Sequence, residues 1–127
     1  MKKLFLLALV FCSYQLRAQI IAGPMLGYVE HREAAVWLEI NDKVNKVAIQ
    51  YWPKEAATNK KTIVYKGKLN NKYNPVTLVL PELQMNTAYQ YQFEIDGKVI
   101  VPSKVYDFKT KDLWEWRKPA PDFKFLY

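Results

Sequence analysis

The most constraining feature of the sequence is an alternating segment at residues 88–96, followed at once by a turn. Apolar residues occupy every second position: Tyr89, Tyr91, Phe93 and Ile95 alternate with Gln90, Gln92, Glu94 and Asp96. This period of two predicts a β-strand with one buried and one solvated face. Asp96-Gly97 then supplies the positive φ angles of a tight hairpin turn, so the segment favours an antiparallel sheet.

Further segments of similar length, separated by turn-prone residues, extend this pattern along the chain. The expected strands are Ile21–Val29, Glu33–Ile40, Lys46–Trp52, Thr62–Lys68, Pro75–Leu80, Ala88–Ile95 and Val105–Lys109. Short strands at regular spacing, with no convincing helix, predict an all-β antiparallel sandwich or barrel. The Ala- and Lys-rich residues 54–62 are expected to form an exposed loop between edge strands.

A motif just before and within the alternating strand narrows the type of sandwich. Leu83-x-Met85-x-Thr87-x-Tyr89-x-Tyr91 resembles the fibronectin type III signature, with Met85 in place of the usual proline. In that immunoglobulin-like fold Tyr89 is the tyrosine-corner residue, whose hydroxyl bonds to backbone a few residues upstream. Trp37, on the second expected strand, is the candidate for the large core aromatic between the sheets. We therefore expect a fibronectin type III-like β-sandwich over residues 19–111.

The first 18 residues have the pattern of a bacterial secretory signal. Lys2-Lys3 precedes a short apolar run at residues 4–11, and the small Ala18 stands before Gln19. The apolar run is too short to span a bilayer comfortably. We expect cleavage after Ala18 and a secreted or periplasmic product with no membrane segment. The alternative is a lipoprotein signal acylated at Cys12, which the bulky residues before that cysteine disfavour.

Signal removal changes both the charge and the cysteine content of the chain. It takes away Lys2, Lys3 and Arg17, so the formal charge falls from +7 to +4. The smaller charge weakens a nucleic-acid interpretation, and no nucleic-acid partner is expected. It also takes the only cysteine, so the mature chain must rest on a hydrophobic core without disulfides or cysteine-bound metal.

Residues 112–127 are expected to form an extended tail beyond the sandwich. A charged stretch with two tryptophans leads to Pro119-Ala120-Pro121, which resists helix and central strand alike. Residues 123–127 then alternate like the first strand of a following domain. Trp114 and Trp116 alternate with Leu113 and Glu115, which makes these two tryptophans candidates for covering an interdomain seam.

Several segments in order resemble the amino-terminal domain of PhoD-type alkaline phosphatases, a metallophosphatase family. They are Gly23–Tyr28, Ala35–Leu38, Val47–Pro53, Leu83–Tyr91 and the exit Phe108–Lys111. The resemblance implies a fibronectin-like domain before a metal-dependent phosphomonoesterase or phosphodiesterase domain that holds calcium and iron. The chain ends before any metal-ligand segment of that family, so no ligand is carried over. Purple acid phosphatases, which have a comparable front domain, are the neighbouring possibility.

The residues themselves predict no catalytic, cofactor or metal site in this chain. A hydrolytic metal centre needs several converging His, Asp or Glu side chains, and His31 is the only histidine. A cluster of lysines offers either a weak anionic site or protection of an exposed sheet edge. It consists of Lys54, Lys60, Lys61, Lys66, Lys68 and Lys72. We expect a secreted non-catalytic front domain that packs against a downstream phosphoesterase domain; the alternative is an independent secreted module that binds glycan or protein.

Overall fold

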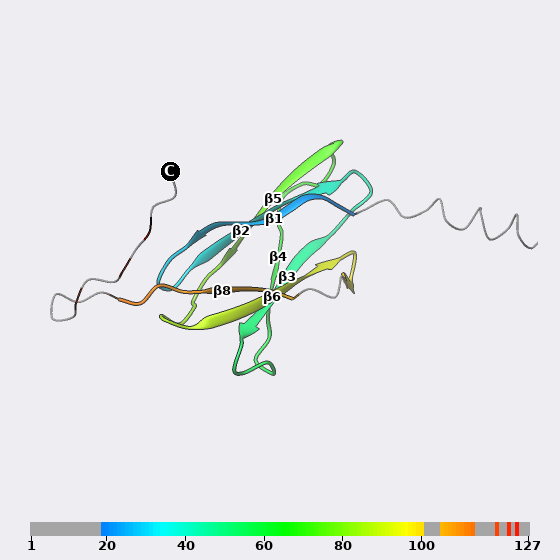
Figure 1. The fold of residues 1–127 in the computed structure, drawn as a ribbon. Coiled ribbons are helices and arrows are strands. Elements are labelled where there is room, and N and C mark those ends of the chain that lie inside the picture. Colours follow the sequence, from blue (N-terminus) through cyan, green and yellow to red (C-terminus); the bar gives the residue numbers. More distant parts are fainter. Residues whose placement is uncertain (1–18, 101–104, 114–118, 120–121, 123, 125–127) are drawn as a thin grey trace, which may run out of the picture.

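The computed structural model describes residues 19–100, 105–113, 119, 122 and 124, and these form an antiparallel β-sandwich (Figure 1). Eight strands make up the fold. They are β1 (Ile20–Val29), β2 (Ala34–Asn41), β3 (Val47–Pro53), β4 (Lys61–Val64), β5 (Tyr73–Leu80), β6 (Ala88–Ile95), β7 (Lys98–Val99) and β8 (Tyr106–Lys109). The predicted fold class is confirmed. The expected signal at residues 1–18 lies outside the described residues.

The strands form two layers with different edges. One sheet has the order β1-β2-β5, and the other has the order β4-β3-β6, with both β7 and β8 paired to β6. β7 pairs with residues 94–95 of β6 and β8 with residues 88–91, so together they cover one edge of that strand. Every pairing is antiparallel. Figure 1 shows β1, β2 and β5 above β3, β6 and β8.

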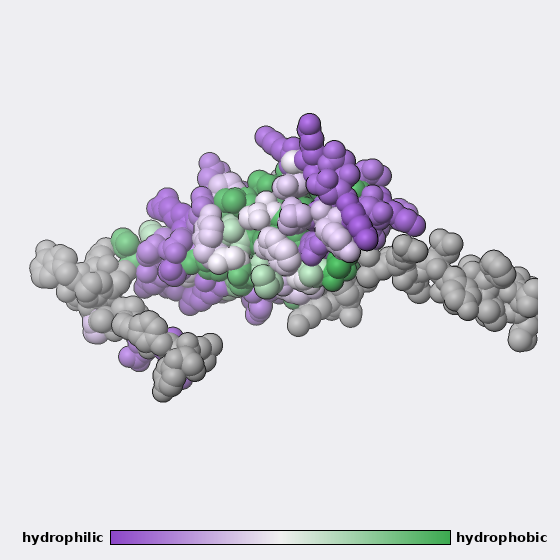
Figure 2. All heavy atoms as spheres, turned by 90° about the horizontal axis from the view of Figure 1, so that it is seen from above, coloured by the Kyte–Doolittle hydropathy of each residue, from purple (hydrophilic) through white to green (hydrophobic). Residues whose placement is uncertain are grey.

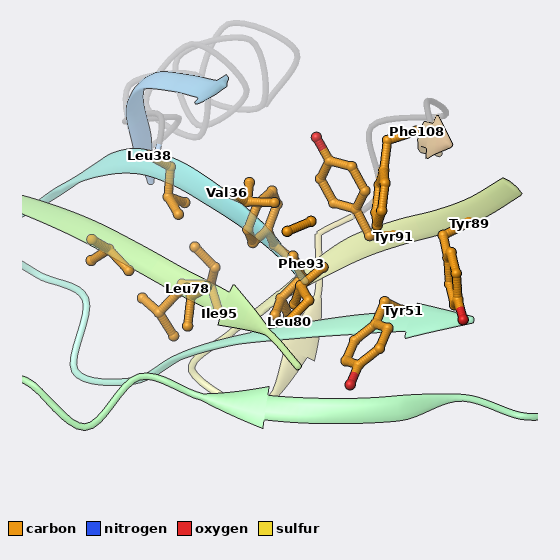
Figure 3. Close-up of a cluster of buried hydrophobic side chains, with 14 of the residues drawn as sticks. Val36, Leu38, Tyr51, Leu78, Leu80, Tyr89, Tyr91, Phe93, Ile95 and Phe108 are labelled. Carbon is orange, nitrogen blue, oxygen red and sulfur yellow. The ribbon is translucent and has the colours of Figure 1, made fainter. Parts of the chain in front are cut away.

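The core lies between the layers and is built by alternation. In β6 the four residues Tyr89, Tyr91, Phe93 and Ile95 are buried, whereas the residues between them are partly exposed. β5 alternates in the same way, and β2 contributes Val36, Leu38 and Ile40. Figure 3 shows labelled side chains of both sheets, Val36 and Leu38 on one and Phe93 and Ile95 on the other, in the space between them. Each fully buried large apolar side chain contributes about 1.5–3 kcal/mol, so the core accounts for the fold without a disulfide.

The hairpin after β6 has the expected geometry. Asp96 and Gly97 adopt φ angles of 50° and 81°, and the turn pairs Ile95 with Lys98. The Asp96 carboxylate also accepts hydrogen bonds from the backbone N–H groups of Asn45 and Lys46, both at 2.9 Å. This turn therefore fastens the β2–β3 loop as well as reversing the chain. The sequence pattern did not predict the two-residue strand β7, because two residues are too few to show alternation.

We expect an alkaline loss of stability that involves Tyr91. Burial raises the pKa of this phenol to about 12 from 10.0, so the neutral form is favoured in the folded protein. The stabilisation that comes from keeping this phenol neutral is complete below pH 10 and is lost as the pH rises through 12, with a total of roughly 3 kcal/mol. Denaturant midpoints between pH 9 and 12 should fall less steeply for Tyr91→Phe than for the native chain. Tyr73→Phe, at a 56% exposed position, should leave the slope unchanged; equal slopes for all three proteins would contradict this expectation.

Candidate functional site

The outer face of the β4-β3-β6 sheet is polar, and its groups bond to one another. The Gln50 amide donates to the Glu94 carboxylate at 3.1 Å and accepts from the Gln92 amide at 2.7 Å. Trp52 donates to Gln90 at 3.3 Å and is only 5% exposed. The ammonium group of Lys60 lies over the Trp52 ring, 4.6 Å from the ring centre. In the described part of this face, the Trp52 ring is therefore covered and the amides of Gln50, Gln90 and Gln92 each have a partner.

The outer face of the β1-β2-β5 sheet is apolar instead. Cross-strand partners share one side of a sheet, and register places Met25 beside Trp37, and Tyr28 beside Ala35. On the other flank of β2, Thr77 pairs with Trp37 and Val79 pairs with Ala35. We call this surface the Trp37 face; its residues are Met25, Tyr28, Ala35, Trp37, Thr77 and Val79. Figure 2 views this side and shows pale and green residues across the middle, with purple residues towards both ends.

The Trp37 face exposes apolar groups on a fixed scaffold. Met25 is 57% exposed, Tyr28 42% and Val79 41%, while Trp37 between them is half-buried. The Tyr28 hydroxyl donates a hydrogen bond to the Glu33 carboxylate, which raises the pKa of Tyr28 and fixes its ring. Contiguous exposed apolar surface of this kind marks interaction sites in soluble proteins.

The prediction that Trp37 is a core aromatic is wrong. In β2 the inward positions are Val36, Leu38 and Ile40, each fully buried, so Trp37 points to the opposite side with Glu39. The reason is the period of two, which puts neighbouring residues on opposite faces. The alternation of Val36, Leu38 and Ile40 with Trp37, Glu39 and Asn41 was the signal that sequence reasoning missed.

The corner before β6 has the contact that its motif predicts. The Tyr89 hydroxyl accepts a hydrogen bond from the backbone N–H of Gln84 at 2.9 Å, and its ring stacks on Phe108 at 5.6 Å. Sequence reasoning missed Thr110, which is only 2% exposed. The Thr110 hydroxyl donates to the Gln84 carbonyl at 2.6 Å and accepts from the Thr87 N–H at 2.9 Å. The corner is therefore closed by two side chains.

The remaining candidates do not converge on a reactive centre. No group of three or more His, Cys, Asp or Glu residues in the described part of the chain is placed to hold a metal ion. His31 lies 3.9 Å from the Glu30 carboxylate in the loop after β1. The six clustered lysines are all exposed, and Lys61 belongs to the edge strand β4. Trp114 and Trp116 lie outside the described residues. Over the described ranges, no helix has both the length and the hydropathy needed to cross a membrane.

These features define an all-β, fibronectin type III-like sandwich module. The chain belongs to the family called Domain of unknown function (DUF7800), whose model matches residues 17–113. No curated protein matches the chain.

Solved structures with the same fold come from proteins of different kinds. The sensor domain of the anti-sigma factor RsgI4 in Pseudobacteroides cellulosolvens has a TM-score of 0.59 and 14% identity, over 80% of this chain and 97% of that one. A solution structure of the same sensor domain has a TM-score of 0.58 and 15% identity, over 86% of this chain and 92% of that one. The fn3 domain of human contactin 1 has a TM-score of 0.58 and 14% identity, over 81% of this chain and 86% of that one. At such identities the likeness shows the fold alone.

The resemblance to PhoD-type alkaline phosphatases is wrong. The matching family is DUF7800, and the similar structures are a sensor domain and fibronectin-type modules. The segments that carried the resemblance lie on the strands and the tyrosine corner, which these sandwiches share, so they report the fold rather than the family. The downstream phosphoesterase domain and its calcium and iron rested on that resemblance and lose their basis with it.

Proposed function

We propose that the chain is an independent secreted recognition module that binds a protein partner through the Trp37 face. The observation that carries this proposal is the contrast between the two outer faces. One is a polar ladder whose side chains bond to one another, and the other exposes Met25, Tyr28 and Val79 around Trp37.

The chemistry of the Trp37 face favours a protein over a glycan. Methionine and aromatic residues are enriched at protein interfaces, and methionine adapts its shape to apolar partners. A sugar-stacking platform needs an open aromatic ring with polar groups around it. Here the ring of Trp37 is half-buried, and its neighbours across the strands are Met25 and Thr77.

Two carboxylates at the margin of the Trp37 face indicate which charge the partner should carry. Glu33 holds the hydroxyl of Tyr28, and Glu39 follows Trp37 on the same outer side of β2. We therefore expect a partner with an apolar centre and Lys or Arg at its margin, because such a pattern complements the carboxylates. A second copy of the chain, docked by a two-fold axis, would bring the same carboxylates into one interface.

Export is expected from the signal-like residues 1–18. When the gene is expressed in a Gram-negative host, the protein should accumulate in the periplasm with Gln19 as its first residue, because Ala18 and the short apolar run before it fit signal cleavage. Mass spectrometry of the purified protein measures the terminus. An intact Met1, or a lipid attached to Cys12, would show that this assignment is wrong.

Photo-cross-linking tests the proposed face with a matched pair of positions. Val79 on the Trp37 face and Val64 on the outer side of the other sheet are both 41% exposed. A photoreactive residue at position 79 should cross-link, in cells that encode the protein, to one partner that binds the native chain again once purified. The same residue at position 64 should give no such product. Equal yields from both positions, or a product made only of two copies of this chain, would refute the proposal.

A further inference from the structure

A groove lies at the end of the sandwich where β3, the β3–β4 loop and the segment between β5 and β6 meet. Two hollows of about 140 and 340 Å³ form it, and Pro53, Asn59 and Gln84 line both. The smaller hollow has room for a group of only a few atoms, and the larger one beside it lies at the lower end of small-molecule pockets, about 300–1,000 Å³. No residue of the Trp37 face lines either hollow, so the groove is a separate site.

Two tyrosines supply the inner wall of the smaller hollow. Tyr51 and Tyr89 are 2% and 4% exposed, and Figure 3 shows their hydroxyl groups directed to the same side of the core. Among the described residues, the Tyr51 hydroxyl has one long contact, of 3.4 Å, to the Pro81 carbonyl. Burial raises the pKa of Tyr51, which keeps this group a protonated donor. The Tyr89 hydroxyl accepts from Gln84, so its own proton remains available to a ligand.

The other groups in the smaller hollow define the chemistry of a ligand. Lys61 and Glu82 bring one positive and one negative charge, and Asn59 brings an amide with both donors and acceptors. Leu83 and Pro53 add apolar surface. Because the charges balance, the site does not select a simple anion or cation. It suits a small ligand whose hydroxyl groups both donate and accept, and whose C–H groups pack on apolar surface.

The burial of the rings argues against a stacked aromatic ligand. Tyr51 and Tyr89 contact each other in the core, with their centres 6.4 Å apart, and are 2% and 4% exposed. Neither ring therefore offers an open face on which a flat aromatic ligand could stack. A saturated ring with hydroxyl groups around it is the chemical class that fits the polar and apolar lining.

The wall formed by residues 81–87 is held in a fixed and unusual conformation. Glu82 and Asn86 have φ angles of 56° and 50°, a region that non-glycine residues rarely occupy and that clusters at ligand sites. Hydrogen bonds keep the segment in place: Leu83 N–H donates to the Arg32 carbonyl at 2.9 Å, and Asn86 N–H to the Lys111 carbonyl at 3.2 Å. The groove is therefore preformed, which lowers the entropic cost of binding.

We propose that this groove, which we call the corner groove, binds the terminal sugar of a glycan. The sugar hydroxyls hydrogen-bond to Tyr51, Asn59 and Glu82, and its C–H face packs on Pro53 and Leu83. The corner groove thus gives the molecule a second ligand, on a different part of its surface from the proposed protein partner. Each site is tested by variants that leave the other intact.

The test is a nuclear magnetic resonance titration of the ¹⁵N-labelled chain with named sugars. The probes are glucose, galactose, mannose and N-acetylglucosamine, each as the free sugar and as its methyl glycoside, which mimics a chain end. At least one glycoside should give saturable shifts at residues 53–61 and 82–88, with a dissociation constant of about 1–10 mM, as expected for a single sugar unit. Asn59→Ala and Glu82→Gln should each weaken binding about fivefold. Asn70→Ala, an exposed loop asparagine at the opposite end, should bind as the native chain does.

Each other outcome overturns the proposal. If no sugar moves these amides, or if only free sugars do, the groove is not a site for a glycan end. If glycerol or sodium phosphate produces the same shifts, the groove takes polar solutes or anions without selecting a sugar. If the shifts fall on Met25, Trp37 and Val79, the sugar binds the Trp37 face instead. If Asn59→Ala and Glu82→Gln keep native affinity, the ligand lies elsewhere.

Discussion

Thr110→Val should lower the free energy of unfolding by about 3 kcal/mol, a large effect for a change that keeps the size of the side chain. The hydroxyl of Thr110 joins the Gln84 carbonyl to the Thr87 N–H inside the corner. The substitution leaves both backbone groups without this partner, and each unsatisfied buried group costs about 1–3 kcal/mol. For a domain of this size the melting temperature should fall by roughly 10–20 °C, which calorimetry measures directly.

Thr110→Ser is the matched control, because it keeps the hydroxyl and loses only a methyl group. It should cost about 1 kcal/mol, the value of one buried methyl or methylene group. If valine were tolerated as well as serine, water or another group would satisfy the corner. Thr110 would then not be the second element that closes it.

Met25→Glu should weaken binding of the cross-linked partner by about 30-fold or more. The substitution places a carboxylate beside Trp37 and adds to the negative charge at Glu39. Interface positions at the centre of an apolar patch commonly carry about 2 kcal/mol or more, which corresponds to this factor. Stability should change by less than about 0.5 kcal/mol, because Met25 is 57% exposed. Titration calorimetry with the purified partner gives the affinity, and thermal melting gives the stability.

Val64→Glu provides the comparison on the other sheet. It replaces an apolar residue of similar exposure by the same carboxylate, so it controls for the general effect of added negative charge. Its affinity for the partner should match that of the native chain. An equal loss in both variants would mean that overall charge, and not the Trp37 face, governs binding.

Much of the fold followed from local pattern. The sequence of β6 was enough to predict this strand. Tyr89, Tyr91, Phe93 and Ile95 alternate with polar residues, and all four are buried. The sequence of Asp96-Gly97 predicted the hairpin turn, and the two φ angles agree. The Leu83–Tyr91 motif predicted a tyrosine corner, because the spacing of Tyr89 from its backbone partner is short. Interactions within a few residues leave a signal that one sequence can show.

The candidate sites depend on longer-range arrangement, and the sequence indicated them poorly. Trp37 was assigned to the core on its size, whereas the register of β2 with β1 and β5 turns it outward beside Met25 and Thr77. Thr110 lies 23 residues from Thr87 and 26 from Gln84, so nothing near it in the chain marks it. The corner groove brings together Tyr51 from β3 and Glu82 from a later loop. A surface made by several strands is visible only once they are paired.

The resemblance to PhoD-type enzymes predicted the wrong family because it, too, rested on local segments. The segments compared with PhoD-type enzymes are those that any fibronectin-like sandwich needs: core strands, a tyrosine corner and an exit strand. Such segments are constrained by packing, whereas function depends on sites placed upon the fold. The Trp37 face is an outer surface, where packing imposes less on residue choice.

Cross-saturation in the complex with the cross-linked partner tests the Trp37 face most directly. In this nuclear magnetic resonance measurement, saturating the partner's protons reduces the signals of groups on this chain that touch it. The methyl signals of Met25 and Val79 and the indole signal of Trp37 should lose intensity, while the methyl signals of Val64 and Val99, which are also exposed, should not. Loss centred on Val64, Val99 or the corner groove, with Met25, Trp37 and Val79 unaffected, would contradict the assignment of this face as the site of recognition.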